Sequence, residues 1–278
     1  MPVSFGYFDR VEGCRMVKEK NKISVTIRTF NEEKNIRECL ESANWADEIV
    51  VVDSNSTDST VAIARGYTSK VITQKWLGHI GQSQFATDQT SNIWVLHMDA
   101  DESVSPELRD EILALDLDNS PYDAYEMPRR HFFMQKWINH SAWYPDYKIR
   151  LFRKDRCRWG GYAPHDEVKV KGRKKKLNKD ILHYIYQDIA HFSATKNNYS
   201  SLTAADHYKN GKKARIIDFT LRPLYAFLYR YLIRLGIVDG VAGFTISVME
   251  AHAVFMKYIK LYELQNKLRR FPGEERER

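Results

Sequence analysis

The sequence predicts an α/β fold in which helices cover a sheet, followed by a helical region at the carboxyl end of the chain. Apolar runs rich in Val and Ile alternate with helical stretches over the first hundred residues, which is the order of β-α-β units. These runs lack the polar alternation of strands that have one face in water, so the first strands are expected to be parallel and covered on both faces. Beyond residue 215 the sequence becomes helix-forming, aromatic and apolar.

The expected elements follow one another from residue 23 onward. Pro106 fits the first turn of a helix that Ser105 would cap, and Asn210-Gly211 is a C-cap signal for the helix before it. Between residues 122 and 170 short, aromatic and basic segments indicate a mixed or antiparallel half of the same sheet. The predicted strands are 23–27, 48–52, 70–73 and 93–98, and the predicted helices are 32–43, 59–65, 82–89, 107–117 and 193–209.

The 278 residues are expected to form three parts. These are an N-terminal extension (1–21), an α/β domain (22–215) and a C-terminal amphipathic helical region (216–278). The three cysteines are widely spaced, which argues against a disulfide framework or a structural zinc site and favours a reducing cytoplasm. We expect neither a secretory signal nor a membrane-spanning run, so the protein is predicted to be soluble or to lie on a membrane.

The formal net charge of +7 predicts an anionic partner surface. That surface is a nucleic acid, a phosphorylated substrate or a membrane face, and charge alone does not choose among them. A basic nucleic-acid-binding module is the rival hypothesis of a different class, although the sequence has no zinc-finger, RRM or KH signature.

Polar residues follow the first two predicted strands. Thr29-Phe30-Asn31-Glu32-Glu33 ends the first strand and Asp53 ends the second. In a doubly wound sheet the ligand crevice lies outside the carboxyl ends of the strands, so both loops are candidates for nucleotide binding. Asp53 could accept hydrogen bonds from a base imide or a ribose hydroxyl. Alternatively, Asn31 caps the helix that follows; we interpret Asp58 as a cap of the next helix.

An acidic triplet follows the strand predicted at 93–98. In an extended segment Asp99 and Asp101 project to one side, with Ala100 opposite. Two carboxylates facing one point suit Mg²⁺ or Mn²⁺, with diphosphate oxygens and water completing the coordination. A solvated loop is the alternative, which the position at a strand end makes weaker.

These three segments, in this order, resemble family 2 glycosyltransferases with the GT-A fold. Trp143-Tyr144-Pro145-Asp146, Arg150-Leu151-Phe152-Arg153 and His165-Asp166-Glu167-Val168 are similar to the branch that contains lipopolysaccharide core glucosyltransferases. The resemblance covers about residues 22 to 210. It implies a Rossmann-like mixed sheet with a C-terminal helical appendage, and an inverting, metal-dependent hexosyltransferase.

The resemblance also implies which residues bind the donor, a UDP-sugar. The loop after the first strand and the end of the second would hold the uridine. The acidic triplet would reach the ribose and, through Mg²⁺ or Mn²⁺ held by Asp99 and Asp101, the diphosphate. The residues expected at the nucleotide are Thr29, Phe30, Asn31, Glu32, Asp53 and Asp99.

The remaining expected site residues lie later in the chain. The base that deprotonates the acceptor hydroxyl is implied to be Asp166, or Glu167 if the loop has shifted. The branch commonly carries a basic residue and an asparagine where Ser83 and Gln84 stand. We therefore expect the contacts of Gln84 with the donor phosphates to differ from those made in the branch. Arg150, like Arg153 on the same strand, is a candidate for binding phosphate or acceptor, because a guanidinium forks onto such oxygens. Alternatively, these arginines face solvent.

The C-terminal region predicts contact with a membrane surface. Between Phe219 and Tyr262, apolar and aromatic residues at helical spacing are interrupted by arginines, which is typical of a helix in a bilayer interface. The basic cluster at 171–176 could meet anionic headgroups. The alternatives are a packed helical appendage or a homodimer interface formed by these helices.

Together these inferences predict transfer of a hexose, most simply glucose, from a UDP-sugar to a lipopolysaccharide core or related lipid-linked saccharide. The protein would be peripheral on the cytoplasmic face of the inner membrane. Transfer to a polyprenyl phosphate or to another glycan is the alternative acceptor choice, and nucleic acid is not an expected partner.

Overall fold

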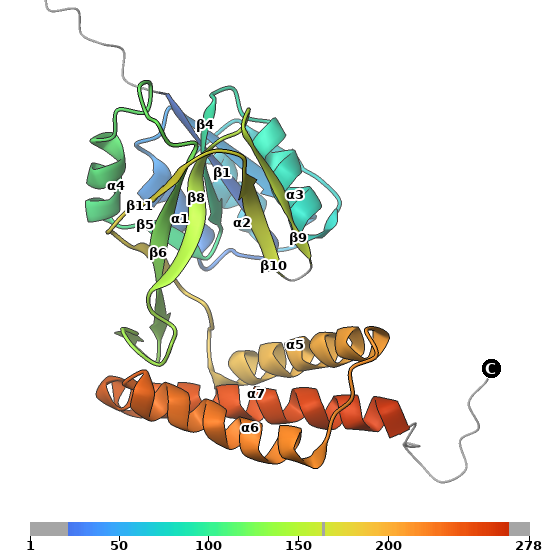
Figure 1. Cartoon of the computed structure of the whole chain (residues 1–278). Coiled ribbons are helices and arrows are strands. Elements are labelled where there is room, and N and C mark those ends of the chain that lie inside the picture. The colour runs from blue at the N-terminus through green and yellow to red at the C-terminus, as the bar shows by residue number, and fades with distance from the viewer. Residues whose placement is uncertain (1–21, 163–164, 267–278) are drawn as a thin grey trace, which may run out of the picture.

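The computed structural model describes residues 22–162 and 165–266, which form an α/β domain joined to a layer of helices (Figure 1). The predicted N-terminal extension, including Cys14, and the tail from residue 267 lie outside the described residues. The mixed sheet and the C-terminal helices confirm the predicted fold class.

A ten-stranded mixed sheet forms the α/β domain. Its strands and those of a separate hairpin are β1 (Ile23–Thr29), β2 (Glu48–Asp53), β3 (Val71–Thr73), β4 (Trp94–Asp99), β5 (Glu102–Val104), β6 (Ala124–Phe133), β7 (Lys136–Trp137), β8 (Asp146–Arg153), β9 (Cys157–Tyr162), β10 (His165–Val170), β11 (Lys174–Lys176) and β12 (Ile181–His183). The main path runs β3-β2-β1-β4-β8-β6-β12-β5, with β7 and β11 paired to β6. The first four strands of the path are parallel, β8 is antiparallel to both neighbours, and β9 pairs with β10 alone.

Helices cover both faces of the parallel half. Helices α1 (Ile36–Ala43), α2 (Thr60–Arg65) and α4 (Pro106–Leu113) contribute to the main core on one face. Helix α3 (Gly78–Asp88) and the β9–β10 hairpin cover the other face. Because β1, β2 and β4 are buried almost throughout, their Val and Ile runs need no polar alternation, as the sequence predicts.

Helix α1 begins four residues later than predicted, because the loop after β1 makes a turn first. Asn31 has a left-handed backbone with φ of 54°, and the amides of Asn35 and Ile36 both donate to the carbonyl of Glu32. Asn31 therefore does not cap α1. Its Oδ1 instead accepts from the amide of Thr57 at 2.8 Å, which ties the loop after β1 to the loop after β2.

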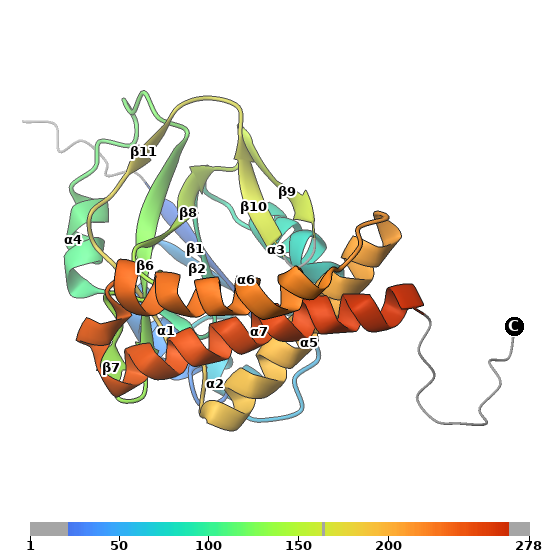
Figure 2. The ribbon, with the colours of Figure 1, turned by 60° about the horizontal axis from the view of Figure 1, so that its bottom comes forward.

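The helical layer consists of α5 (Ile189–Lys209), α6 (Ile216–Leu228) and α7 (Val241–Asn266). A π-helical turn, η1 (Tyr229–Ile233), and a 3₁₀ turn, η2 (Gly236–Asp239), join α6 to α7, which lie side by side (Figure 2). The predicted division at residue 215 stays a prediction; α5, which precedes it, packs mainly against α7. None of the helices in the described ranges combines the length and the apolar character that a membrane-spanning helix requires.

The far end of β6 and the loop after it join the two parts of the molecule. Phe133, Trp143 and Phe192 meet α7 in a buried apolar cluster. The carboxylate of Asp239 accepts from the amide of His140 at 3.0 Å, and the indole of Trp143 donates to Glu250 on α7 at 3.3 Å. These contacts hold the helical layer against one end of the sheet.

The basic strand β11 lies away from that junction. Lys174 to Lys176 pair with Ala124 to Glu126, at the start of β6, whereas the helices are reached from its other end at Phe133. The lysine cluster and the C-terminal helices therefore lie toward opposite ends of β6. This placement disfavours contact of both with the same membrane surface.

Candidate functional site

The register of the parallel strands aligns the predicted nucleotide loops. Arg28 on β1 lies opposite Asp99 on β4, and Thr29 lies opposite Asp53 on β2. The carboxyl ends of the three strands therefore meet at one edge of the sheet, which is where ligands bind in open α/β sheets.

Asp53 is buried at this edge with 1% of its surface exposed. Its carboxylate accepts hydrogen bonds from the amide of Ser56 at 2.9 Å and from the hydroxyl of the same residue at 2.5 Å. These bonds fix the loop after β2. Asp58 accepts from the amide of Thr60 at 3.0 Å and from the amide of Glu33 at 3.2 Å, but the N-cap of α2 is Ser59, so Asp58 supports the helix start without being its cap. Recognition of the uridine by Asp53 stays a prediction.

The loop after β1 combines a buried polar group with an exposed ring. The Oγ1 of Thr29 is buried without a hydrogen-bond partner among the described residues, and the ring of Phe30 is 56% exposed. Such a ring can stack on a nucleotide base. Burial raises the pKa of Glu32, and the nearby carboxylate of Asp101 raises it further.

Arg28 is the cation that joins separate parts of the site. Its Nε donates to Asp99, and its Nη1 donates to Asp166 of β10 at 3.1 Å and to Ser83 of α3 at 3.1 Å. Side chains from β4, α3 and the β9–β10 hairpin thus converge on the guanidinium of β1. Arg28 was not among the predicted site residues, although a charged residue near the end of an apolar parallel strand was a signal for it.

A second buried arginine lies beneath Asp99. The Nη2 of Arg150 donates to Asp99 at 2.8 Å and to Glu102 at 2.6 Å, and Arg129 donates to Glu102 at 3.0 Å. Burial alone would raise the pKa of Asp99, but Arg28 and Arg150 outweigh this effect and hold it well below its usual range. Asp99 is therefore ionised, and Arg150, an expected phosphate ligand, is engaged in ion pairs inside the protein.

Asp101 lies beside a histidine. The Nε2 of His183 on β12 is 3.1 Å from Oδ2 of Asp101, and the two Nδ1 atoms of His131 and His183 are 2.8 Å apart. Burial lowers the pKa of His131 to about 4, so its ring is neutral. The short strand 181–183 gave no local signal that His183 would reach the acidic triplet.

The side chains available to a metal ion differ from the predicted pair, Asp99 and Asp101. Asp99 turns toward two arginines, while Asp101 and His183 present a carboxylate oxygen and an imidazole nitrogen to each other. The carboxylate fits Mn²⁺ or Mg²⁺ with diphosphate oxygens as further ligands, and the imidazole favours Mn²⁺ over Mg²⁺, which prefers oxygen. No cluster of three or more His, Cys, Asp or Glu side chains with metal-binding geometry occurs within the ranges that the structure describes. Binding of metal by Asp99 and Asp101 stays a prediction.

The two candidate bases lie on opposite sides of β10. Asp166 points toward Arg28 and its side chain is 13% exposed. Glu167 is 60% exposed and forms an ion pair with Lys169. Alternation along the strand separates the neighbouring carboxylates, so Asp166 is the one directed into the site.

Helix α3 turns Ser83, rather than Gln84, toward the site. Gln84 accepts from the amide of Trp159 at 3.0 Å and donates to Asp88 at 2.8 Å, so it joins α3 to β9. The Oγ of Ser83 lies 3.4 Å from Nε2 of His97, a buried residue of β4. Burial, followed by the charges of the two site arginines, lowers the pKa of His97 to about 3. Donor binding by Gln84 stays a prediction.

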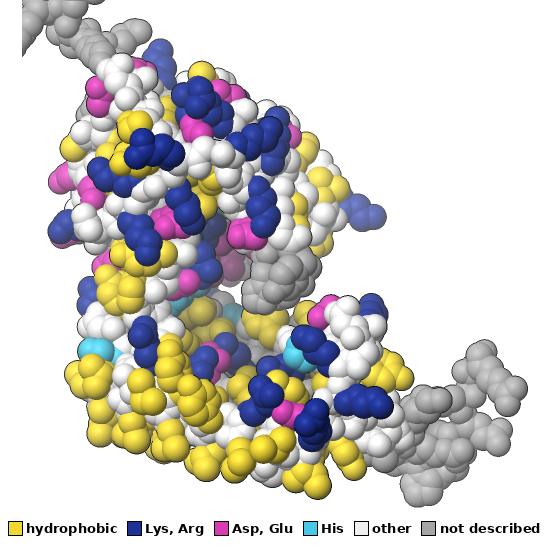
Figure 3. All heavy atoms as spheres, viewed as in Figure 1, with side chains coloured by type: hydrophobic (Ala, Val, Ile, Leu, Met, Phe, Trp, Pro, Cys, Tyr) yellow, Lys and Arg dark blue, Asp and Glu magenta, His cyan; other side chains and the backbone are white. Residues whose placement is uncertain are grey.

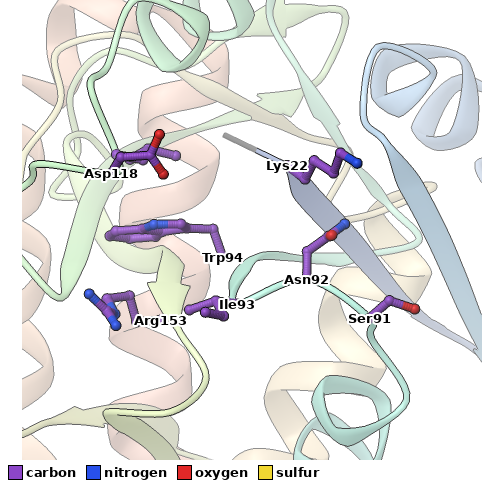
Figure 4. A pocket seen from close by; sticks show the side chains of 8 residues that line it. Lys22, Ser91, Asn92, Ile93, Trp94, Asp118 and Arg153 are labelled. Carbon is purple, nitrogen blue, oxygen red and sulfur yellow. The ribbon is translucent and has the colours of Figure 1, made fainter. Parts of the chain in front are cut away.

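Arg153 lies at the opposite end of the sheet. It pairs with Asp155 and lines a pocket of about 430 Å³ at the start of β4, where Trp94 lies between it and Asp118 (Figure 4). Because Asp99 is at the other end of β4, this pocket is separate from the candidate site.

The candidate site faces the helical layer. The ring of His131 packs edge-on against Trp143, which donates to Glu250 of α7. The Nζ of Lys34, in the loop after β1, donates at 3.3 Å to Oε1 of Gln187, which lies two residues before α5. Figure 3 shows the surface hollowed between the α/β domain and the helices.

Comparison with known sequences gives a consistent group of relatives. Residues 24–182 match the family described as Glycosyl transferase family 2. An uncharacterized glycosyltransferase of Rickettsia typhi is 36% identical over an alignment of 262 positions that covers 89% of each chain. The lipopolysaccharide core biosynthesis glycosyltransferase LpsC of Rhizobium meliloti is 27% identical and covers 88% of this chain and 93% of its own.

Two solved structures are similar at lower identity. Residues 1–349 of Staphylococcus aureus TarS give a TM-score of 0.44 at 16% identity, covering 90% of this chain and 93% of that chain. The glucosyl-3-phosphoglycerate synthase of Mycobacterium tuberculosis gives a TM-score of 0.47 at 14% identity, covering 69% and 80%.

Proposed function

The chain belongs to glycosyl transferase family 2, and on that premise we propose that it is an inverting, metal-assisted hexosyltransferase. The donor is a UDP-sugar, most simply UDP-glucose. The acceptor is a lipopolysaccharide core or a related lipid-linked saccharide. Family membership makes the rival hypothesis of a nucleic-acid-binding module unnecessary.

One observation carries the proposal. Arg28 donates to Asp99, at the end of the strand expected to hold the donor, and to Asp166, the carboxylate expected to activate the acceptor. The residue expected to bind the donor and the residue expected to activate the acceptor therefore lie in one site. Direct transfer requires this, because the attacking hydroxyl and the anomeric carbon must come within a few ångströms of each other.

The donor would lie across the carboxyl ends of β1, β2 and β4. Phe30 and the loop that Asp53 fixes are available to the uracil, and Asp99 is an ionised acceptor for the ribose hydroxyls. Asp101 and His183 are suited to hold a divalent cation at the diphosphate. That cation would stabilise the negative charge of the departing UDP.

Asp166 would act as the general base. Its carboxylate takes the proton of the acceptor hydroxyl as that oxygen bonds to the anomeric carbon, on the face opposite the diphosphate. The bond from the anomeric carbon to the diphosphate oxygen breaks in the same step, and UDP leaves with the electron pair. This displacement inverts the anomeric configuration.

The choice of acceptor rests on two supports. LpsC, which shares 27% identity over most of both chains, is a lipopolysaccharide core glycosyltransferase. The helices beside the site expose an apolar surface, which suits a protein peripheral on the cytoplasmic face of the inner membrane. A lipid-linked saccharide would then be reached from that surface.

Transfer assays test the proposal. The purified chain is incubated with Mn²⁺ and UDP-, GDP- or dTDP-sugars, and with intact core glycolipid, delipidated core oligosaccharide or polyprenyl phosphate. We expect hexose transfer from the UDP-sugar to the two core acceptors, with the anomeric configuration inverted. Transfer to polyprenyl phosphate alone would support the alternative acceptor, and use of GDP- or dTDP-sugars alone would contradict the proposed donor.

A further inference from the structure

The helical layer exposes an unusual amount of apolar surface. Sixteen of the 25 large hydrophobic side chains that are exposed in the described part of the chain lie between Ile216 and Leu264. Figure 3 shows hydrophobic side chains along the edge of the helical layer that faces away from the α/β domain. Soluble monomers rarely expose a contiguous apolar patch of this extent, so the surface is expected to be covered by a partner.

The exposed side chains follow helical spacing. On α6 they recur at Leu221, Leu224, Leu228 and, in η1, Leu232. On α7 they recur every three to four residues from Val241 to Val248. We call this surface the apolar face. Its most exposed members are Ile216, Tyr225, Ile233, Val238 and Val241.

Other side chains of the same helices are already packed inside the chain. Phe227 and Tyr231 contact one edge of Phe244, whose ring is also 48% exposed at the apolar face, and so join α6 and η1 to α7. Ala242 and Ile246 lie in the cluster that meets the α/β domain. The apolar face is therefore not the inner surface of this chain, and its partner comes from outside the described structure.

The charges around the apolar face are positive. Between residues 212 and 241 the sequence has six basic residues but only two acidic ones, Asp218 and Asp239. Both carboxylates are buried, where Asp218 bonds to Arg222 and Asp239 bonds to His140. The basic residues Lys213 and Arg234 are exposed. An apolar surface flanked by cations is complementary to a bilayer that carries anionic headgroups.

We infer that the apolar face docks on an anionic lipid bilayer, with α6, the η1–η2 turn and the start of α7 lying in the interface. A twofold contact between two copies of this face would bring the same cations together, which disfavours dimerisation. Helix α5 lies on the side of α6 and α7 that faces the α/β domain (Figure 1), so the site would lie within about two helix diameters, ~20 Å, of the bilayer surface. The inference deepens the proposed function, because it names the surface from which a lipid-linked acceptor is reached.

Vesicle flotation tests the docking without donor or acceptor. The full chain is mixed with phosphatidylcholine vesicles that do or do not contain phosphatidylglycerol, at low and at high salt. We expect binding to the anionic vesicles that weakens with salt. The double variant Leu224→Glu with Ile233→Glu should bind about tenfold more weakly or worse. Lys213→Glu with Arg234→Glu should lose mainly the preference for anionic lipid.

Ile93→Glu is the matched control. Ile93 is 51% exposed on the α/β domain, close to the 55% and 65% of Leu224 and Ile233, so all these variants should fold; circular dichroism and donor hydrolysis check this. The inference is overturned if the wild type does not bind vesicles, or if the control loses as much binding as the double variant. It is also overturned if the double variant abolishes a dimer and leaves vesicle binding unchanged. Vesicle binding without sugar transfer would reject the proposed function alone.

Discussion

The Nη1 atom of Arg28 lies 3.1 Å from Oδ2 of Asp166, a residue 138 positions later in the chain. The same guanidinium binds Asp99 through Nε. One cation at the end of β1 therefore connects the strand expected to hold the donor with the hairpin expected to activate the acceptor.

Replacing Asp166 by Asn should lower kcat by about 10² to 10⁴-fold, because the amide cannot take the acceptor proton. Donor binding should change little. Glu167→Gln is the matched control and should retain most of the activity, since that side chain points away from the site. Steady-state assays of UDP release, together with calorimetric titration of UDP, separate the two effects. A severe loss in Glu167→Gln with an active Asp166→Asn would move the base to Glu167.

Arg28→Met should lower the free energy of unfolding by about 2 to 4 kcal/mol, because Asp99 and Asp166 would lose a shared, largely buried partner. Arg153→Met removes a pair whose carboxylate, Asp155, is 46% exposed and should cost about 1 kcal/mol or less. Urea unfolding of both variants at neutral pH measures the difference. Equal losses of unfolding free energy in the two variants would show that the ion pairs of Arg28 stabilise the fold no more than an exposed pair does.

Manganese should raise the melting temperature of the wild type in the presence of UDP, because binding to the native state stabilises it. Asp101→Asn and His183→Ala should each remove most of this rise, since these residues offer the metal donors. Asp118→Asn, at the opposite end of the sheet, serves as the control. If both site variants kept the full manganese effect, the metal would have to be held elsewhere, with Asp99 the first alternative.

His97 should make the protein less stable as the pH falls below neutrality. Its pKa is lowered to about 3 in the folded state, below the ordinary value of about 6.5, so the unfolded chain binds the proton first. The stability that His97 contributes is thus fully present above about pH 6.5 and declines by up to about 1.4 kcal/mol per pH unit as the pH falls toward 3.

The matched variant for this effect is His97→Gln, which can keep a hydrogen bond to Thr26 without titrating. Urea unfolding between pH 7 and 5.5 should show a shallower loss of stability in the variant than in the wild type. Parallel pH profiles for the two proteins would mean that His97 is protonated in the folded state as readily as in the unfolded chain.

Much of the α/β domain was predictable from local pattern. The Val and Ile runs of β1, β2 and β4 identified buried parallel strands, and Ser105 caps α4 as expected, accepting from the amide of Leu108 at 3.1 Å. Helix boundaries were less predictable. Helix α1 starts late because Asn31 adopts a left-handed backbone and bonds to the neighbouring loop, a contact made 26 residues away in sequence.

The sequence by itself determined the family, the order of the loops and the acidic residues among which a site could form. It did so because motifs and apolar periodicity are short-range properties of the chain. Only the tertiary structure decided that Arg28 and Arg150 take up Asp99, that His183 meets Asp101, and that Asp166 rather than Glu167 faces the site. These contacts join residues 51 to 138 positions apart, so they depend on strand register and on how the hairpin folds back over the sheet.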